Sequence, residues 1–293
     1  MDSPVVNIIK SSGERVPFSK QKLHDSLKRS GASEQIINGV IKEVESLLHE
    51  GIDTRTIFRM AFKLLKKQSK HTAAKYKLKE AIMELGPSGF PFEKFISEIL
   101  KHQGFKTNVG EIVKGKCVNH EIDVIAQKDD KHFMIECKYH NERGINCNVK
   151  IPLYIKARFE DIEPNWKSLP GHEGKFHQGW VITNTRFSSD AIQYGLCAGL
   201  HLVSWDFPKN GSLKDQINFS GLFPITCMTT LTIVEKQKLL DKNVVLCLEI
   251  FKNPEWLMQI GISPDRSATI LKEAQAICEV IENTNDKKND NIQ

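Results

Sequence analysis

The sequence predicts a multidomain α+β protein with a small, mostly helical N-terminal domain, a central α/β domain with a mixed sheet, and a C-terminal helical domain. Two β-rich segments follow one another in the middle of the chain, and stretches with helical periodicity precede and follow them. A Gly-Pro-Ser-Gly break at 86–89 closes the first helical stretch. We therefore expect domains at 1–87, 88–210 and 225–283, followed by a disordered polar tail at 284–293.

Composition is typical of a packed cytoplasmic protein with no membrane contact. An apolar share of 40% over 293 residues is ample for packed cores. No apolar run approaches the length of a membrane helix, and the start lacks a signal segment. The seven cysteines show no CxxC spacing, so they indicate reduced thiols rather than disulfides or a zinc site. A net charge of +5 permits nucleic-acid binding without establishing it.

The N-terminal stretch is expected to begin with two short extended pieces and to continue as helices. An apolar run at 5–9 stops at Ser11-Ser12-Gly13, and a second extended piece follows at 15–18. Ser19 is a good N-cap for a helix through Arg29. Further helices are expected from about Ser33 to His49, from an Asp53 or Thr54 cap onward, and up to the break at Gly86.

The central β-rich segments are expected to form an antiparallel hairpin around the polar break at 127–131. With Asp129-Asp130 as a two-residue loop, Asp123 lies opposite Glu136, their side chains about 5 Å apart on one face. Lys138 projects from that face two residues further on.

This trio of side chains suits metal-assisted hydrolysis of a phosphodiester. Two close carboxylates repel unless a cation lies between them, and hard oxygen ligands suit Mg²⁺. An ammonium beside them can hold a phosphate or orient water. The structural alternatives are a turn role for Asp123 and a cross-strand salt ladder between Glu136 and Lys138.

The ordered set Asp123…Glu136-x-Lys138 resembles the core of the PD-(D/E)xK nucleases, and the surrounding sequence resembles their Mrr-like restriction endonuclease branch. The helix start at 89–95 and the segment at 179–188 carry the rest of a resemblance that spans about residues 88 to 207. A restriction-endonuclease-like fold is therefore implied. A second Glu-x-Lys, at 173–175, lies between glycines and has no apolar strand around it.

This resemblance also implies roles for individual residues. Asp123 and Glu136 would hold Mg²⁺, with the carbonyl of Cys137 as a further ligand and Glu93 as a supporting acid. Lys138 would orient and help to deprotonate the attacking water, or stabilise the charge that develops on the phosphate.

Other polar and aromatic residues of the centre are assigned lesser roles. Lys150, Lys156 and Arg158 could follow a DNA backbone. His120 and His140 are expected to face DNA or solvent rather than a metal. Packing is the expected role of Trp180, Phe187 and Trp205, and Gln178 is a weak candidate for contact with the site.

The N-terminal stretch resembles the ATP-cone, the nucleotide-sensing module of ribonucleotide reductases. The matching pieces are 6–13, Phe18-x-x-x-Lys22-Leu23, Ile52-x-Thr54 and Ala73-Ala74-Lys75-Tyr76. The resemblance implies binding of ATP or dATP by Lys10, Gly13, Lys22 and Thr54. The sequence departs from the pattern at Ser11, Ser12 and Phe58, where members carry a basic residue, an acid and, in some, histidine. The structural alternative is that both lysines are solvated surface charges.

The C-terminal stretch is expected to be helical from about Thr229. The pattern at 257–263 followed by 270–274 resembles a helix-hairpin-helix element, which presents backbone N–H groups to phosphates. A packing or dimerisation bundle is a nearly equal alternative. Ser263 and Pro264 predict the start of a helix through Ile281.

These patterns predict a Mg²⁺-dependent endonuclease that acts on double-stranded DNA, responds to ATP or dATP through its N-terminal domain, and forms homo-oligomers. The alternative is a nucleotide-regulated DNA-binding module without turnover, against which the intact acid-acid-lysine set argues. A repressor of the kind that joins a cone to cysteine zinc ligands is disfavoured, because no CxxC is present.

Overall fold

The computed structural model of the chain describes residues 6–10, 12–142 and 144–278. The described chain divides into two compact units. The terminal unit joins the described residues up to Ala81 with those from Ile225 onward, and the central unit is Ile82–Pro224. Ser11, the tail predicted at 284–293, and the last residues of the helix predicted through Ile281 lie outside the described residues.

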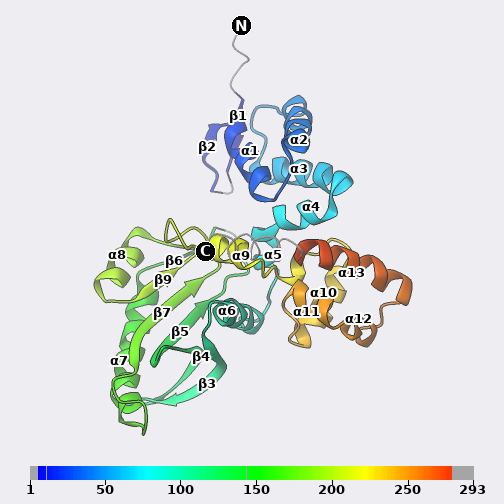
Figure 1. Cartoon of the computed structure of the whole chain (residues 1–293). Coiled ribbons are helices and arrows are strands. Elements are labelled where there is room, and N and C mark those ends of the chain that lie inside the picture. The colour runs from blue at the N-terminus through cyan, green and yellow to red at the C-terminus, as the bar shows by residue number, and fades with distance from the viewer. Residues whose placement is uncertain (1–5, 11, 143, 279–293) are drawn as a thin grey trace, which may run out of the picture. The chain divides into compact units, whose positions relative to one another are not determined.

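The terminal unit begins with the cone segment, a two-stranded antiparallel sheet followed by helices (Figure 1). Its elements are β1 (Asn7–Ile9), β2 (Arg15–Pro17), α1 (Lys20–Arg29), α2 (Glu34–Ser46), α3 (Thr54–Gln68), α4 (Lys70–Tyr76) and α5 (Leu78–Met83), the last of which runs on into the central unit.

The predicted helix starts of the cone segment are confirmed by the side chains that cap them. Ser19 accepts from the N–H of Lys22, and Ser33 accepts from that of Ile36. Asp53, rather than Thr54, caps α3 by accepting from the N–H of Thr56. These bonds satisfy amides that the first turn of a helix leaves unpaired.

The C-terminal segment of the terminal unit is helical, as predicted, and its α13 packs against α4 of the cone segment. Its elements are the 3₁₀ turn Ile225–Cys227, α10 (Ile233–Asp241), α11 (Cys247–Lys252), α12 (Glu255–Gln259) and α13 (Pro264–Cys278). A buried carboxylate, Glu273, fixes the loop before α10, because it accepts four hydrogen bonds of 2.5–2.9 Å from Thr229 and Thr230.

The central unit contains a mixed five-stranded sheet, so the predicted α+β class is confirmed. The strand order is β3-β4-β5-β7-β9, with antiparallel pairs from β3 to β5 and parallel pairs from β5 to β9. Its elements are α6 (Phe90–His102), β3 (Lys106–Lys114), β4 (Asn119–Lys128), β5 (Lys131–Lys138), β6 (Asn146–Cys147), α7 (Lys150–Ser168), β7 (Phe176–Thr183), β8 (Arg186–Phe187), α8 (Ser189–Cys197), β9 (His201–Val203) and α9 (Leu213–Ser220).

The hairpin predicted for β4 and β5 is present with the expected loop. Lys128 pairs with Lys131, so Asp129 and Asp130 form a two-residue connection. Their φ values of 51° and 57° are those of the turn that best matches the twist of a hairpin.

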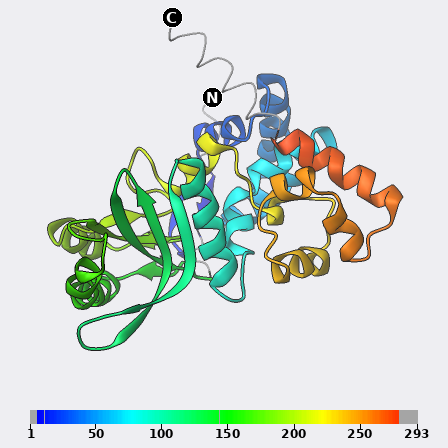
Figure 2. The ribbon, with the colours of Figure 1, turned by 60° about the horizontal axis from the view of Figure 1, so that its bottom comes forward.

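Helices α6 and α7 lie on opposite faces of this sheet (Figures 1 and 2). The apolar side of α7 packs on a core that includes Met134 and Val181. Phe159 of α7 occupies the space where a side chain at Gly179 would lie, so glycine is needed there for close packing. Among the helices of the described ranges, none is long and apolar enough to cross a membrane.

Candidate active site

The predicted acid pair lies where β4 and β5 run side by side. The ladder between the two strands is regular up to Val124 and Ile135, which brings Asp123 next to the end of that pairing. The Asp123 carboxylate accepts the backbone N–H of Cys137, with 2.6 Å between Oδ2 and N. This bond ties Asp123 to the residue that follows Glu136 and holds the two acids on neighbouring strands.

Lys138 lies on the same strand as Glu136, and its side chain is directed at that acid. Its Nζ is 2.7 Å from Glu136 Oε1. The strand end is fixed by β7, since Thr183 Oγ1 donates to the carbonyl of Lys138 over 2.8 Å. Just beyond, Asn184 bonds both the N–H and the carbonyl of His140. The position of the ammonium is therefore set by the sheet.

Arg158 of α7 is a fourth member of the site. Its Nη1 lies 2.6 Å from Glu136 Oε2, and its Nη2 donates to the carbonyl of Glu121. Glu136 is 4% exposed, and each of its carboxylate oxygens contacts one cationic side chain, Lys138 or Arg158. Sequence reasoning placed Arg158 on a DNA track. Its proximity to Glu136 depends on how α7 sits on the sheet, for which the sequence has no local signal.

The remaining carboxylates of the site hold protons unusually tightly. Burial and the neighbouring Glu136 raise the pKa of Asp123 to about 6, although the Cys137 N–H and the two cations oppose this. Burial, followed by the charges of Asp123 and other acids, raises the pKa of Glu93 on α6 to about 7. Burial opposes the charge of Lys138, but Glu136 outweighs it and raises the pKa of the ammonium. The surroundings of Asp123 and Glu93 therefore disfavour the charged forms of both carboxyls.

The donor chemistry of the site fits a hard divalent cation. Asp123 and Glu136 offer carboxylate oxygens, and their mutual repulsion is what a cation would relieve. In the described ranges, no three acids, histidines or cysteines are grouped closely enough to hold a metal by themselves. The charges of Asp123 and Glu136 raise the pKa of Glu93, but Glu93 does not form a three-carboxylate metal site with them. Backbone carbonyls and water would have to supply the other ligands.

The histidines of the centre serve the fold. His120 Nε2 lies 2.8 Å from Asp161, which also accepts backbone N–H groups of the β3–β4 loop. His140 Nε2 lies 3.3 Å from the thiol of Cys147, and burial lowers the pKa of His140. Gln178 is directed away from the acid pair, since it donates to the carbonyl of Gly199.

The aromatic residues assigned to packing do pack. Trp180 meets Phe105 and Phe133 edge-on, with ring centroids 5.9 and 5.4 Å apart. Phe187 and Trp205 are buried.

The cone segment contains a recess of about 230 Å³ beside its two strands. Lys10, Lys22 and Thr54, three of the residues predicted to contact nucleotide, all line it. The fourth, Gly13, has a φ of 83° in the turn between β1 and β2 and lies outside the lining. The structure thus brings together two lysines and a hydroxyl from three separate parts of the sequence.

Aromatic rings form a further wall of this recess. Phe58 and Tyr76 stack with centroids 4.9 Å apart and planes 8° from parallel. Lys10 pairs with Glu14 over 2.8 Å, whereas Lys22 has no ion pair within the described part of the chain. The recess combines an apolar, aromatic surface with positive charge, as a base and its phosphates require.

Comparison with known families agrees with these two sites. Residues 6–79 match the ATP cone domain, 86–151 match a restriction endonuclease domain, and 223–278 match the AF1548-like C-terminal domain. The predicted fusion of an ATP-cone with an Mrr-type domain is thus confirmed, and it indicates a nuclease with a nucleotide-binding domain.

Individual relatives extend the comparison. A protein of Archaeoglobus fulgidus described only as uncharacterized is 32% identical over 186 residues, covering 62% of this chain and 99% of its own length. The crystal structure of AF1548, a protein of unknown function, matches with 32% identity and a TM-score of 0.55, over 65% of this chain and 98% of that one. Can2 from Sulfobacillus thermosulfidooxidans, solved with cyclic tetra-adenylate, matches with 12% identity and a TM-score of 0.33, over 68% of this chain and 54% of that one. So loose a superposition supports no inference.

Proposed function

The chain belongs to the AF1548-like family, and from this premise we propose that it is a Mg²⁺-dependent endonuclease for double-stranded DNA whose activity responds to ATP or dATP. The observation that carries the proposal is the pairing of Asp123 with Glu136 on adjoining strands, with the Lys138 ammonium 2.7 Å from Glu136. A divalent cation bound between the two carboxylates would relieve their mutual repulsion.

Asp123, Glu136 and the carbonyl of Cys137 are the groups that would hold the metal. When bound, Mg²⁺ supplies a Lewis acid for the scissile phosphate and lowers the pKa of a coordinated water. Lys138 would orient the attacking water or neutralise charge developing on the phosphate, from the position that β5 and β7 give its Nζ.

Two further groups have roles in this proposal. Burial and the neighbouring acids raise the pKa of Glu93 to about 7, so its carboxyl can take up or release a proton near neutral pH. Arg158 of α7 contacts Glu136 Oε2 and so helps to orient the carboxylate that would hold a metal. Both residues would therefore tune the site.

The recess of the cone segment would bind the regulatory nucleotide, with phosphates at Lys10 and Lys22 and the base beside Phe58 and Tyr76. A nucleotide can change activity or assembly only if it prefers one state of the protein. We propose that this state is a homo-oligomer whose stability depends on the bound purine nucleotide.

A DNA-binding module without turnover is the second candidate, and one observation favours it. Both oxygens of Glu136 already hold a cationic side chain, which lessens its need for a metal. In that case Asp123 would serve the fold as the hydrogen-bond acceptor for the Cys137 N–H. The two functions differ in whether DNA is cut.

The test is incubation of supercoiled plasmid with the full-length protein, with Mg²⁺ or with EDTA, and with and without ATP or dATP. Plain, methylated and branched DNA would be compared in parallel. Nicked or linear product that needs Mg²⁺ and changes with nucleotide is the expected result. Retention of DNA without cleavage under every condition would favour the binding module instead.

A further inference from the structure

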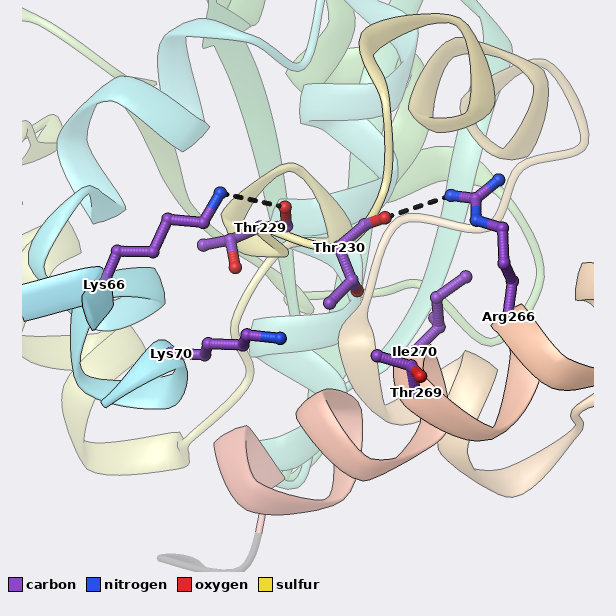
Figure 3. Close-up of a pocket in the computed structure, with 7 residues that line it drawn as sticks. All are labelled: Lys66, Lys70, Thr229, Thr230, Arg266, Thr269 and Ile270. Atoms are coloured by element: carbon purple, nitrogen blue, oxygen red, sulfur yellow. Dashed lines mark hydrogen bonds between the residues drawn. The ribbon is translucent and has the colours of Figure 1, made fainter. Parts of the chain in front are cut away.

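A second basic recess lies within the terminal unit, apart from the nucleotide recess of the cone segment. It has a volume of about 230 Å³ and is lined by Lys66, Lys70, Thr229, Thr230, Arg266, Thr269 and Ile270. Figure 3 shows the two lysines reaching in from one side, Arg266 on the other, and the two threonines of the α10 loop between them. The lining therefore comes from both segments of the unit.

The charge of this recess is positive and incompletely compensated. Three cationic side chains and no carboxylate line it. Arg266 pairs with Glu235 through two contacts of 2.5 and 3.0 Å, which neutralises one charge. Lys66 meets only the carbonyl of Thr229 at 3.5 Å, and Lys70 makes no hydrogen bond or ion pair in the described ranges.

The polar groups at the recess are set to favour an anion. The hydroxyl groups of Thr229 and Thr230 donate their hydrogen bonds to Glu273. This carboxylate is buried and does not line the recess. The ammonium groups of Lys66 and Lys70 and the exposed hydroxyl of Thr269 are the donors that remain, because the Arg266 guanidinium already donates to Glu235 and to the carbonyl of Thr230. A compact group made only of acceptor oxygens with a charge near −2 matches this set, and phosphate is such a group.

We propose that this recess binds a phosphate group of a small soluble ligand, either free phosphate or the phosphates of a nucleotide. A ligand there would touch α3 and α4 of the cone segment through the lysines, and α13 through Arg266 and Thr269. It would therefore strengthen the packing of the C-terminal segment on the cone segment. The site shares no lining residue with the cone recess, and the proposal does not rest on nuclease activity.

The experiment uses the full-length chain carrying Lys22→Ala, which weakens nucleotide binding in the cone recess. Calorimetric titration with inorganic phosphate and, separately, with ATP measures what remains. Lys70→Ala in that background is expected to weaken binding at least tenfold, since the amine has no structural partner whose loss would disturb the fold. Thr269→Glu, which adds a carboxylate to the lining, should have an equal or larger effect.

Lys67→Ala and Lys272→Ala are the matched controls, because both remove an exposed lysine of α3 or α13 that does not line the recess. A loss on Lys70→Ala that is seen with ATP alone would identify nucleotide as the source, and a loss seen with both ligands would identify free phosphate as sufficient. The proposal is overturned if Lys70→Ala binds both ligands as Lys67→Ala does.

Discussion

The acidic site of the central unit and the basic recesses of the terminal unit are opposite in charge and in their degree of burial. Glu136 is 4% exposed and holds a cation on each oxygen, while burial raises the pKa of Asp123 to about 6. Lys22, Lys66 and Lys70 lie at the surface, and none of them has an acidic partner in the described chain.

The comparison teaches that the same kind of charge imbalance has different consequences at the two depths. Water and salt screen the exposed lysines, so each contributes modestly to binding and nothing to chemistry. Charges at the buried acid pair are screened far less, so removing one changes every neighbour. Large effects are therefore expected in the central unit and moderate ones in the terminal unit.

The largest effect is expected from Asp123→Ala. It removes a metal ligand and the acceptor for the Cys137 N–H. Cleavage should fall on the order of 10³-fold or more, because charge stabilisation at the phosphate is lost. DNA binding should be retained or tightened, since a negative charge leaves the phosphate track. Plasmid cleavage and a gel-shift titration measure the two properties, and circular dichroism checks the fold. Undiminished cleavage by the folded variant would remove Asp123 from the site.

Substitutions at Lys138 test whether the site needs a compact ammonium group or only a positive charge. Lys138→Ala should lose about 10²-fold or more in cleavage, as expected for a positioned acid-base or electrostatic group, and Lys138→Arg should recover little of it. Guanidinium is planar and would meet Arg158 across Glu136, whereas the ammonium lies 2.7 Å from Oε1. Single-turnover rates of the three proteins provide the measurement. Near-wild-type turnover of the arginine variant would show that Lys138 is only an electrostatic clamp.

Lys22→Ala should weaken ATP or dATP binding about tenfold, which is about 1.4 kcal/mol. The loss is limited because Lys10 still lines the recess and the aromatic wall is unchanged. Calorimetry measures the affinity, and light scattering reports whether nucleotide still changes the mass of the particle. Lys20→Ala, an exposed lysine outside the recess on the same helix, is the control. Equal affinities of the Lys22 and Lys20 variants would leave the cone segment without its proposed phosphate contact.

The smallest effect concerns stability against pH without metal. Glu93 and Asp123 have raised pKa values in the folded chain, about 7 and about 6. The folded protein therefore binds protons that the unfolded chain has released, and the stability this gives is present below about pH 4 and lost as pH rises through 6 and 7. In EDTA, Tm should fall by a few degrees from pH 5 to pH 8, and Glu93→Gln should flatten the slope. A Glu93→Gln slope equal to that of the wild type would remove Glu93 from the charged cluster.

The sequence predicts those parts of the fold and of the site that depend on residues close together in the chain. The loop Asp129-Asp130 follows from two β-rich segments around a polar break, and the register of Asp123 follows from the loop. The caps Ser19 and Ser33 follow from their place before apolar periodicity. In each case the deciding contacts are close in sequence.

The rest depends on contacts between distant parts of the chain. Arg158 reaches Glu136 from α7, and α7 packs closely on the sheet where Phe159 meets Gly179. The second basic recess needs the α10 loop beside α3 and α4, and Glu273 of α13 fixes that loop. Neither contact leaves a periodicity or a motif in the sequence from which it could be predicted.

Two glutamates in the same Glu-x-Lys spacing allow the central claim to be tested most directly. Glu136 is buried between Lys138 and Arg158, whereas Glu173 is exposed in the loop before β7. The measurement is Mg²⁺-dependent cleavage of supercoiled plasmid by Glu136→Gln and by Glu173→Gln, beside the wild type and an EDTA control. The account predicts that the wild type and Glu173→Gln cut at equal rates and that Glu136→Gln loses about 10³-fold or more. Equal cleavage by both variants, or cleavage that persists in EDTA, would contradict it.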